Sequence, residues 1–461
     1  MDSQSVLSVA IVGAGIAGLT AAIALQGKPG IDVRIYERTK ELREVGATIA
    51  LGPNGLRTLE RLGINNALDD SIAFRNKSGH PMIYRHAQTN ETVSADSHVG
   101  HIEPRHRTAR FFRPHLQRAL LQHVEPSRLH LGKAFSSIKP TQDGSRVVLT
   151  FADGTTTEAD VVLGADGIHS AVRRAFVPET SAHWTGWVVF RSVFPRSVVA
   201  HIPDLPDEAV HYWGVDRTLF LSPLAGGGGE DLYAIVGSTQ CDPEEEASGA
   251  TSSKGEPVWN REGSLEEVRE LYKDWHPTLR AIIEANPHTR VYHNAAADGL
   301  DSWVLGGGRV TVAGDAAHAH GGAFAAGGSL AIDDAWAFAQ SILHVFAREI
   351  SSAASSAREV ADGTRSAPSP LQKRDKGDKV TAALQLYEKT RKQHTDRVQK
   401  TVADKNRATL QRLRSGVIES DQELRRRMRT RQDLAWIHEH DVVSCFIKAV
   451  GSSEGELVSH L

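Results

Sequence analysis

The chain has 461 residues, with 53 basic and 56 acidic side chains and a formal net charge of −3. This length allows two to four domains of ordinary size, or one large enzyme. The nearly balanced charge argues against nucleic-acid binding, because no basic surface is available to release counterions from phosphates. The two cysteines, Cys241 and Cys445, are too few for a disulfide scaffold or a cysteine-rich zinc or iron–sulfur site.

The sequence has no run of about 18 apolar residues, and its N-terminus lacks the basic and apolar regions of a signal peptide. We therefore expect a soluble, cytoplasmic protein without a membrane span. The 22 histidines include no HExxH or similar spacing, so the sequence predicts no metal site.

The beginning of the chain has the pattern of a strand, a glycine turn, a helix and a second strand. Residues 6–12 form a short apolar run, residues 16–26 carry a helical apolar face, and residues 32–37 alternate as in a strand. This βαβ start predicts a parallel sheet with right-handed crossovers. In the middle of the chain, residues 180–292 have short β-like runs between Pro- and Gly-rich turns, which predicts a mainly antiparallel sheet.

The strand–turn–helix pattern returns near Arg309, so the first domain is predicted to be discontinuous. Residues 351–379 are rich in Ser, Ala and charge without apolar periodicity, which predicts a disordered insertion, and residues 380–461 form a charged helical region. We expect the first domain to comprise residues 1–75, 103–178 and 293–350, and a second domain to comprise residues 76–102 and 179–292.

The glycine turn has the pattern G-x-G-x-x-G, formed by Gly13, Gly15 and Gly18. The pattern is weak evidence alone, but here it follows a predicted strand, opens a predicted helix, and has Glu37 at the end of the next strand. The first glycine permits the tight turn, the second lets backbone approach a pyrophosphate, and the third allows close helix–strand packing. The Glu37 carboxylate can accept both hydroxyls of an adenosine ribose. The sequence therefore favours a dinucleotide site over an ordinary glycine turn with a surface Glu.

Two later segments carry further motifs. Residues 164–173 place Asp166 in an Asp-Gly turn after a predicted strand, and residues 309–338 run from a strand ending in Gly-Asp through a second glycine turn into a helix. With the N-terminal fingerprint, they resemble the three-motif signature of class A flavoprotein monooxygenases, the group that contains salicylate and para-hydroxybenzoate hydroxylases. Their order and spacing are most similar to the salicylate hydroxylase branch and its fungal relatives. The resemblance covers about residues 6–410.

This resemblance implies an α/β fold with a doubly wound, FAD-binding βαβ domain of the para-hydroxybenzoate hydroxylase type. It also implies a mainly antiparallel substrate-domain sheet and a C-terminal helical segment. The implied activity is an FAD-dependent monooxygenase that consumes NADPH or NADH and O2 and hydroxylates a small aromatic or phenolic, salicylate-like substrate. In similar enzymes O2 adds at flavin C4a, and the distal oxygen passes to an electron-rich ring carbon.

Two other functions are compatible with these motifs. One is a flavin monooxygenase or epoxidase that acts on a non-phenolic scaffold of secondary metabolism. The other is a protein similar to GTPase dissociation inhibitors, which share the fold and bind prenylated GTPases without flavin. The intact Asp-Gly and Gly-Asp motifs argue against this second alternative. The helical tail can also support a homodimer.

The resemblance assigns five residues to the cofactor. Asp315 would accept a hydrogen bond from the ribityl chain unless it is a helix or turn cap, and the backbone at Gly328 would approach the flavin. Arg113 would contact FAD, the alternative being a solvated arginine at a helix start. Ala50 lies where relatives contact the cofactor through backbone groups. Asp166 belongs to the motif implicated in FAD and NAD(P)H handling, and a structural turn aspartate is equally compatible.

On the substrate side, Arg191 matches the position where this branch carries an arginine on the sheet over the flavin. An arginine among apolar strand residues needs a partner, which is either an anionic substrate or an internal ion pair. Tyr212 is the candidate to replace a tyrosine that relatives often pair with this arginine. We therefore expect Arg191 and Tyr212 to be catalytic.

The Gly-Asp motif is followed by His318, His320 and a glycine-rich loop. The histidines can assist phenol deprotonation, or they can be hydrogen-bonded residues of the turn. Gly322 replaces a proline of the family pattern, and Ser329 replaces an asparagine. More glycine predicts a more pliable loop beside the flavin.

Overall fold

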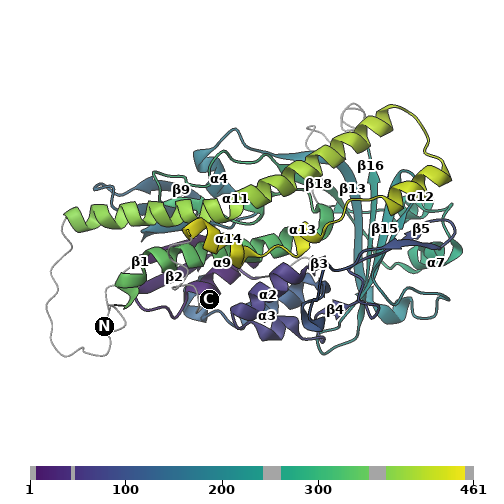
Figure 1. Ribbon diagram of the computed structural model, residues 1–461, viewed down its shortest axis with the longest axis horizontal. Coiled ribbons are helices and arrows are strands. Elements are labelled where there is room, and N and C mark those ends of the chain that lie inside the picture. Colours follow the sequence, from purple (N-terminus) through teal and green to yellow (C-terminus); the bar gives the residue numbers. More distant parts are fainter. Residues whose placement is uncertain (1–6, 43–46, 242–260, 352–369, 452–461) are drawn as a thin grey trace.

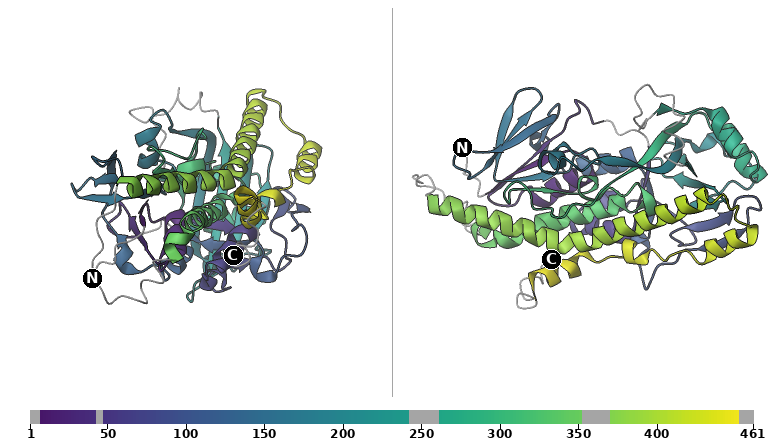
Figure 2. Two further views of the ribbon diagram at one scale, coloured as in Figure 1. Left: turned by 60° about the vertical axis from the view of Figure 1, so that its left-hand side comes forward. Right: turned by 90° about the horizontal axis from the view of Figure 1, so that it is seen from above.

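The computed structural model describes residues 7–42, 47–241, 261–351 and 370–451. Figure 1 shows an elongated molecule with a parallel sheet towards one end, a large sheet towards the other, and one long helix, α11, lying along both. The views in Figure 2 agree on this arrangement. This mixed α/β architecture with a C-terminal helical segment confirms the predicted fold class.

The parallel sheet has five strands in the order β19-β12-β1-β2-β8, and each neighbouring pair is parallel. The strands are β1 (Leu7–Val12), β2 (Ile31–Tyr36), β8 (Leu129–His130), β12 (Val161–Gly164) and β19 (Val310–Val312). Helix α1 (Ile16–Leu25) connects β1 to β2 and is almost entirely buried. The predicted βαβ start is therefore confirmed, because its short apolar runs lie inside a sheet covered on both faces.

Two small antiparallel sheets accompany the parallel one. The first has the order β11-β10-β9, and the second has the order β3-β7-β4. Their strands are β9 (Phe135–Pro140), β10 (Val147–Phe151), β11 (Thr156–Ala159), β3 (Thr48–Leu51), β4 (Phe74–Arg75) and β7 (Ala109–Phe112).

The large sheet has eight strands in the order β17-β18-β13-β16-β15-β14-β5-β6. It is antiparallel except where β14 pairs with β5, which confirms the predicted, mainly antiparallel second sheet. Its strands are β5 (Ile83–His86), β6 (Thr92–Ala95), β13 (Ala182–Pro195), β14 (Val210–Trp213), β15 (Arg217–Leu224), β16 (Leu232–Gln240), β17 (Arg261–Glu262) and β18 (Arg290–Ala297). Helices α6 (Leu265–Leu271) and α7 (Pro277–Ala285) share a buried apolar cluster with one face of this sheet.

Further helices surround the sheets, and none of the helices in the described ranges has the length and apolarity to cross a membrane. They are α2 (Pro53–Arg61), α3 (Arg113–Leu121), α4 (Ala171–Phe176), α8 (Asp315–His318), α9 (Gly327–Val345), α11 (Pro370–Arg414), α12 (Asp421–Arg429), α13 (Ala435–His438) and α14 (Val442–Val450). Helix α11 begins ten residues before the predicted start at residue 380, so the last part of the predicted insertion is helical. Residues 352–369 of that prediction lie outside the described residues, and the domain boundaries stay a prediction.

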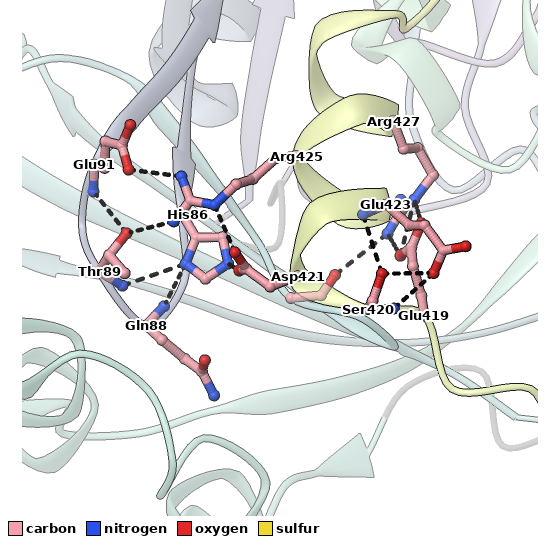
Figure 3. Close-up of polar contacts among 11 residues, drawn as sticks. His86, Gln88, Thr89, Glu91, Glu419, Ser420, Asp421, Glu423, Arg425 and Arg427 are labelled. Carbon is pink, nitrogen blue, oxygen red and sulfur yellow. Dashed lines mark hydrogen bonds and ion pairs between the residues drawn. The ribbon is translucent and has the colours of Figure 1, made fainter.

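Helix α12 is fixed to the β5–β6 edge of the large sheet by charged groups (Figure 3). The Arg425 guanidinium pairs with Asp421 of the same helix at 2.8 Å and with Glu91 at 2.6 Å. Buried His86 contacts the Asp421 carboxylate through Nε2 at 2.7 Å. Ser420 and Glu423 form a capping box at the start of the helix. The chain after α11 is therefore held against the large sheet.

A buried carboxylate joins α11 to the Gly-Asp motif. Asp334 of α9 accepts hydrogen bonds from Nε of Arg391 at 2.9 Å, from the Gly314 N–H at 3.0 Å and from Nε2 of His318 at 2.6 Å. The side chains of Asp334, Arg391 and His318 are buried, and the interactions with His318 and Arg391 lower the pKa of Asp334 to about 2 despite its burial. The adjacent Asp333 accepts from Asn54 and Thr58, but burial raises its pKa to about 6.

We expect Asp334→Asn to lower the free energy of unfolding by about 3–5 kcal/mol, because it leaves Arg391 buried without its counter-charge. The matched control is Asp333→Asn, which removes a charge that burial already disfavours and should cost much less. Urea unfolding of both variants at neutral pH measures the difference. Equal losses would contradict the assignment of Asp334 as the carboxylate that joins α11 to α9.

Candidate active site

The glycine turn between β1 and α1 has an open side and a packed side. Gly13 has φ +106°, and a Cβ there would lie 2.4 Å from the Ala165 carbonyl oxygen. A Cβ on Gly18 would lie 2.0 Å from the Gly13 oxygen, so this glycine is required for packing. A Cβ on Gly15 would meet nothing within 4 Å. The backbone at Gly15 therefore faces open space at the N-terminus of α1, where a phosphate group fits.

Glu37 directly follows β2 and reaches the glycine turn. Its Oε2 accepts a hydrogen bond from the Ala14 N–H at 2.9 Å, and its Oε1 accepts from Thr39 N–H at 2.9 Å. The carboxylate is partly exposed beside the open side of the turn. This is the position from which a carboxylate can accept ribose hydroxyls of a dinucleotide.

Asp315 begins α8 directly after β19, and its side chain is exposed, unlike the buried residues on both sides of it. A Cβ on Gly327, the first residue of α9, would lie 3.9 Å from Asp315 Oδ1. The carboxylate therefore points towards the start of α9. Together with the open side of the turn at Gly15 and the partly exposed Glu37 carboxylate, this arrangement fits FAD.

Three other residues predicted to bind FAD, namely Arg113, Ala50 and Asp166, differ in their burial and contacts. Arg113 is the first residue of α3 and is partly buried, and Ala50 lies on β3 opposite Arg110 of β7. The Asp166 carboxylate accepts hydrogen bonds from the N–H groups of Ala171 and Val172 and from the Ser170 hydroxyl, so it caps α4. These bonds match the structural alternative for Asp166.

Gly328 packs closely against β3. A Cβ there would lie 2.8 Å from Ile49 Cδ1 and 2.9 Å from Leu51 Cδ2. The missing side chain thus eases the approach of α9 to β3, and the approach of this backbone to flavin stays a prediction.

Arg191 lies on β13 and faces the glycine-rich turn that follows α8. Its Nη2 lies 4.0 Å from the position of a Cβ on Gly322, and its guanidinium lies over the Tyr292 ring at 5.0 Å. Burial lowers the pKa of Arg191, and the nearby Arg113 lowers it further. No carboxylate of the described residues pairs with Arg191, so the internal ion pair that the sequence left open is not formed there.

The expectation that Tyr212 acts beside Arg191 is wrong in its geometry. Register pairing puts Arg191 in one row with Val236, Phe220 and His211 across β13, β16, β15 and β14. Tyr212 is one residue further along β14 and therefore faces the opposite side of the sheet. There it is fully buried, and its hydroxyl donates to Asn90 Oδ1 at 2.9 Å. Which face a strand residue occupies depends on register, which local sequence did not reveal.

The two histidines after the Gly-Asp motif are buried, and each makes a hydrogen-bonding contact inside the protein. His318 is 1% exposed and bonds to Asp334, and His320 is 3% exposed with Nδ1 3.2 Å from the His318 carbonyl. Burial lowers the pKa of His320. The predicted alternative of hydrogen-bonded residues in the turn therefore describes both histidines better than a role in phenol deprotonation.

Three residues at or beside the turn after α8, Phe324, Ala325 and Lys405, were not predicted from the sequence. Phe324 and Ala325 have φ of 60° and 52°, a conformation that non-glycine residues adopt only at a cost. Lys405 of α11 places its ammonium 4.9 Å from the centre of the Phe324 ring. The spacing of buried residues on α11 was a signal that could have identified Lys405.

Comparison with known proteins identifies the family of this chain. Residues 6–357 match the model of the FAD binding domain family. The chain is 32% identical to 6-hydroxynicotinate 3-monooxygenase of Pseudomonas fluorescens over 71% of this chain and 80% of that protein. It is 29% identical to 6-methylsalicylate 1-monooxygenase of Aspergillus terreus over 73% of this chain and 74% of that protein.

Solved structures share the fold. A salicylate hydroxylase in complex with substrate superposes with a TM-score of 0.72 at 21% identity, over 97% of this chain and 98% of that one. HpxO of Klebsiella pneumoniae in complex with FAD and uric acid gives 0.66 at 21% identity, over 96% and 97%. The chain belongs to the FAD binding domain family and is an FAD-dependent aromatic monooxygenase. The alternative of a flavin-free GTPase-binding protein is thereby set aside.

The two sides of the glycine turn give a test. We expect Gly15→Ala to leave the thermal stability of the FAD-free protein nearly unchanged, because its φ of −76° and open surroundings accept a methyl group. The same methyl group should raise the Kd for FAD by about tenfold or more, since it lies where the pyrophosphate approaches.

The control is Gly18→Ala, which should cost about 1–3 kcal/mol even without FAD, because its Cβ would overlap the Gly13 oxygen. Thermal unfolding of the FAD-free proteins and fluorescence titration with FAD separate the two effects. A loss of stability in Gly15→Ala as large as in Gly18→Ala would contradict the open side of the turn.

Proposed function

We propose that the protein hydroxylates a small, salicylate-like aromatic acid or phenol, with NADH or NADPH and O2 as co-substrates. The observation that carries this proposal is Arg191, a desolvated guanidinium that has no carboxylate partner among the described residues. Leaving a buried charge unpaired is costly, and an anionic substrate would supply the missing partner. The relatives support this choice, because hydroxynicotinate and methylsalicylate, which their names contain, are aromatic acids.

The proposed division of labour follows from the positions of the residues. When bound, FAD supplies the redox chemistry that transfers oxygen to the ring. The backbone at Gly15 binds its pyrophosphate, Glu37 binds the adenosine ribose, and Asp315 binds the ribityl hydroxyls. Arg191 holds the substrate oxygen as phenolate, because a guanidinium in a desolvated place favours the anion over the neutral phenol.

The electron donor and the compartment are part of the same proposal. The described residues contain one glycine-fingerprint βαβ unit, so NADH or NADPH would reach the flavin without a nucleotide-binding domain of its own. The cytoplasm is the proposed compartment, in keeping with Cys241 and Cys445 not being joined in a disulfide.

The first experiment is oxidation of NADH and of NADPH by the purified holoprotein, with and without salicylate, together with product analysis. Salicylate-stimulated oxidation with stoichiometric catechol would support a decarboxylating hydroxylase. If only other phenols stimulate oxidation, the proposed reaction stands and the proposed substrate changes. If no aromatic acid or phenol stimulates oxidation, the proposed substrate class is wrong.

We expect Arg191→Met to raise KM for the stimulating substrate about 10- to 100-fold while the FAD content stays unchanged, because one charge-assisted contact is lost. Tyr212→Phe is the control, since it removes a hydroxyl on the other face of the sheet. It should leave kcat and KM within about twofold and cost about 1 kcal/mol of stability. Steady-state kinetics and urea unfolding measure these effects. A kinetic defect in Tyr212→Phe equal to that in Arg191→Met would contradict the roles assigned here.

A further inference from the structure

One face of helix α11 carries a buried stripe that is followed by an exposed lysine. Arg391, Thr395, Val398 and Val402 are all buried, and they follow one another at spacings of four, three and four residues. Lys405 is three residues further on, and its side chain is exposed. Residues at this spacing share one face of a helix. Lys405 therefore lies on the same face of α11 as the buried residues, at the point where this face becomes accessible to solvent.

The surroundings of the Lys405 ammonium are aromatic and cationic. It lies 4.9 Å from the centre of the Phe324 ring, and its charge lowers the pKa of His211 on β14, which burial brings to about 3. Burial also lowers the pKa of Lys405, and Arg427 of α12 adds to this. Solvent still reaches the Lys405 side chain. In the part of the chain that the structure describes, no carboxylate pairs with it.

Arg427, unlike Lys405, has a carboxylate partner among the described residues. Its guanidinium pairs with Glu419 at 2.7 Å (Figure 3). It also lies over the Trp213 ring at 5.0 Å. The charge of Arg427 is therefore compensated inside the protein, whereas the charge of Lys405 is available to a ligand.

Lys405 and Arg191 both lie next to the turn that follows α8. Gly322, at the start of this turn, lies beside Arg191, and Phe324, two residues later, lies beside Lys405. On the sheet, Arg191 and His211 share a row but are separated by β16 and β15. Three strand spacings amount to about 14 Å between the backbones. Arg191 and Lys405 therefore lie beside the same turn, Arg191 at Gly322 and Lys405 at Phe324.

We propose that Lys405 is a specificity-determining residue that binds a carboxylate on the side of the aromatic ring opposite the phenolate held by Arg191. This inference rests on the proposed function and narrows its substrates to aromatic acids whose carboxylate lies across the ring from the hydroxyl, unlike salicylate, in which the two groups are adjacent. An accessible ammonium without a carboxylate partner can pair with a charged ligand, and the Phe324 ring 4.9 Å from it offers an apolar surface for the substrate ring.

The test compares an acid with its neutral amide in the FAD-loaded protein. The Kd values of 4-hydroxybenzoate and 4-hydroxybenzamide are measured from the perturbation of the flavin absorbance. Wild type should prefer the acid, and Lys405→Met should weaken acid binding by about tenfold or more while amide binding stays within about twofold. Lys405→Arg should keep most of the preference. Lys400→Met, which removes an exposed lysine from the same helix, should change neither Kd.

Three results would overturn this inference: equal weakening of acid and amide, unchanged acid binding in Lys405→Met, or no binding of 4-hydroxybenzoate to wild type. Flavin content is measured for every variant. A loss of flavin in Lys405→Met would show that Lys405 acts on FAD binding or on folding, and this result would also count against the proposal. Salicylate distinguishes a failure of the role of Lys405 from a failure of the proposed function. If salicylate or a neutral phenol stimulates NAD(P)H oxidation while 4-hydroxybenzoate does not bind, the proposed function stands and the role of Lys405 falls.

Discussion

The buried carboxylate of Asp334 is the constraint on which the cofactor end of the structure depends. Removing a carboxylate from water is costly, and here the cost is offset by a guanidinium, an imidazole and a backbone N–H that all donate to it. These donors belong to α11, α8 and the residue before Asp315. The direction of the Asp315 carboxylate and the course of the turn after His318 are therefore fixed by a group that need not touch cofactor or substrate.

Helix α11 extends this constraint to the large sheet. Near one end, the Tyr387 hydroxyl donates to the Val312 carbonyl of β19 at 3.0 Å, and Arg391 reaches Asp334. Further along, Asn406 accepts from the Trp187 indole of β13 at 3.2 Å. One continuous helix thus contacts both the parallel sheet and the strand that carries Arg191 (Figure 1). The relative position of the cofactor-side and substrate-side groups is set by a rigid element instead of a linker.

The parts that could be predicted from sequence are those encoded locally. The β1–α1–β2 unit and its glycines follow from apolar periodicity and from packing distances within one motif. Tyr212 could not be assigned, because its face depends on a register set by three neighbouring strands. The role of His318 depends on Asp334, a partner on another helix. The position of Lys405 could have been predicted from the sequence, because its helical spacing from Arg391, Thr395, Val398 and Val402 is a local property of α11.

The turn after α8 contains strained residues as well as glycines. Its glycines predict a pliable loop, but two of its residues, Phe324 and Ala325, have a strained left-handed backbone although they are not glycine. Such strain persists only where packing over-determines the conformation. The Phe324 ring packs against an apolar cluster that includes Val398 of α11 and Ile437 of α13, and it also lies beside the Lys405 ammonium. The glycines therefore provide the bend, and the phenylalanine holds the turn against α11, so that Gly322 stays next to Arg191.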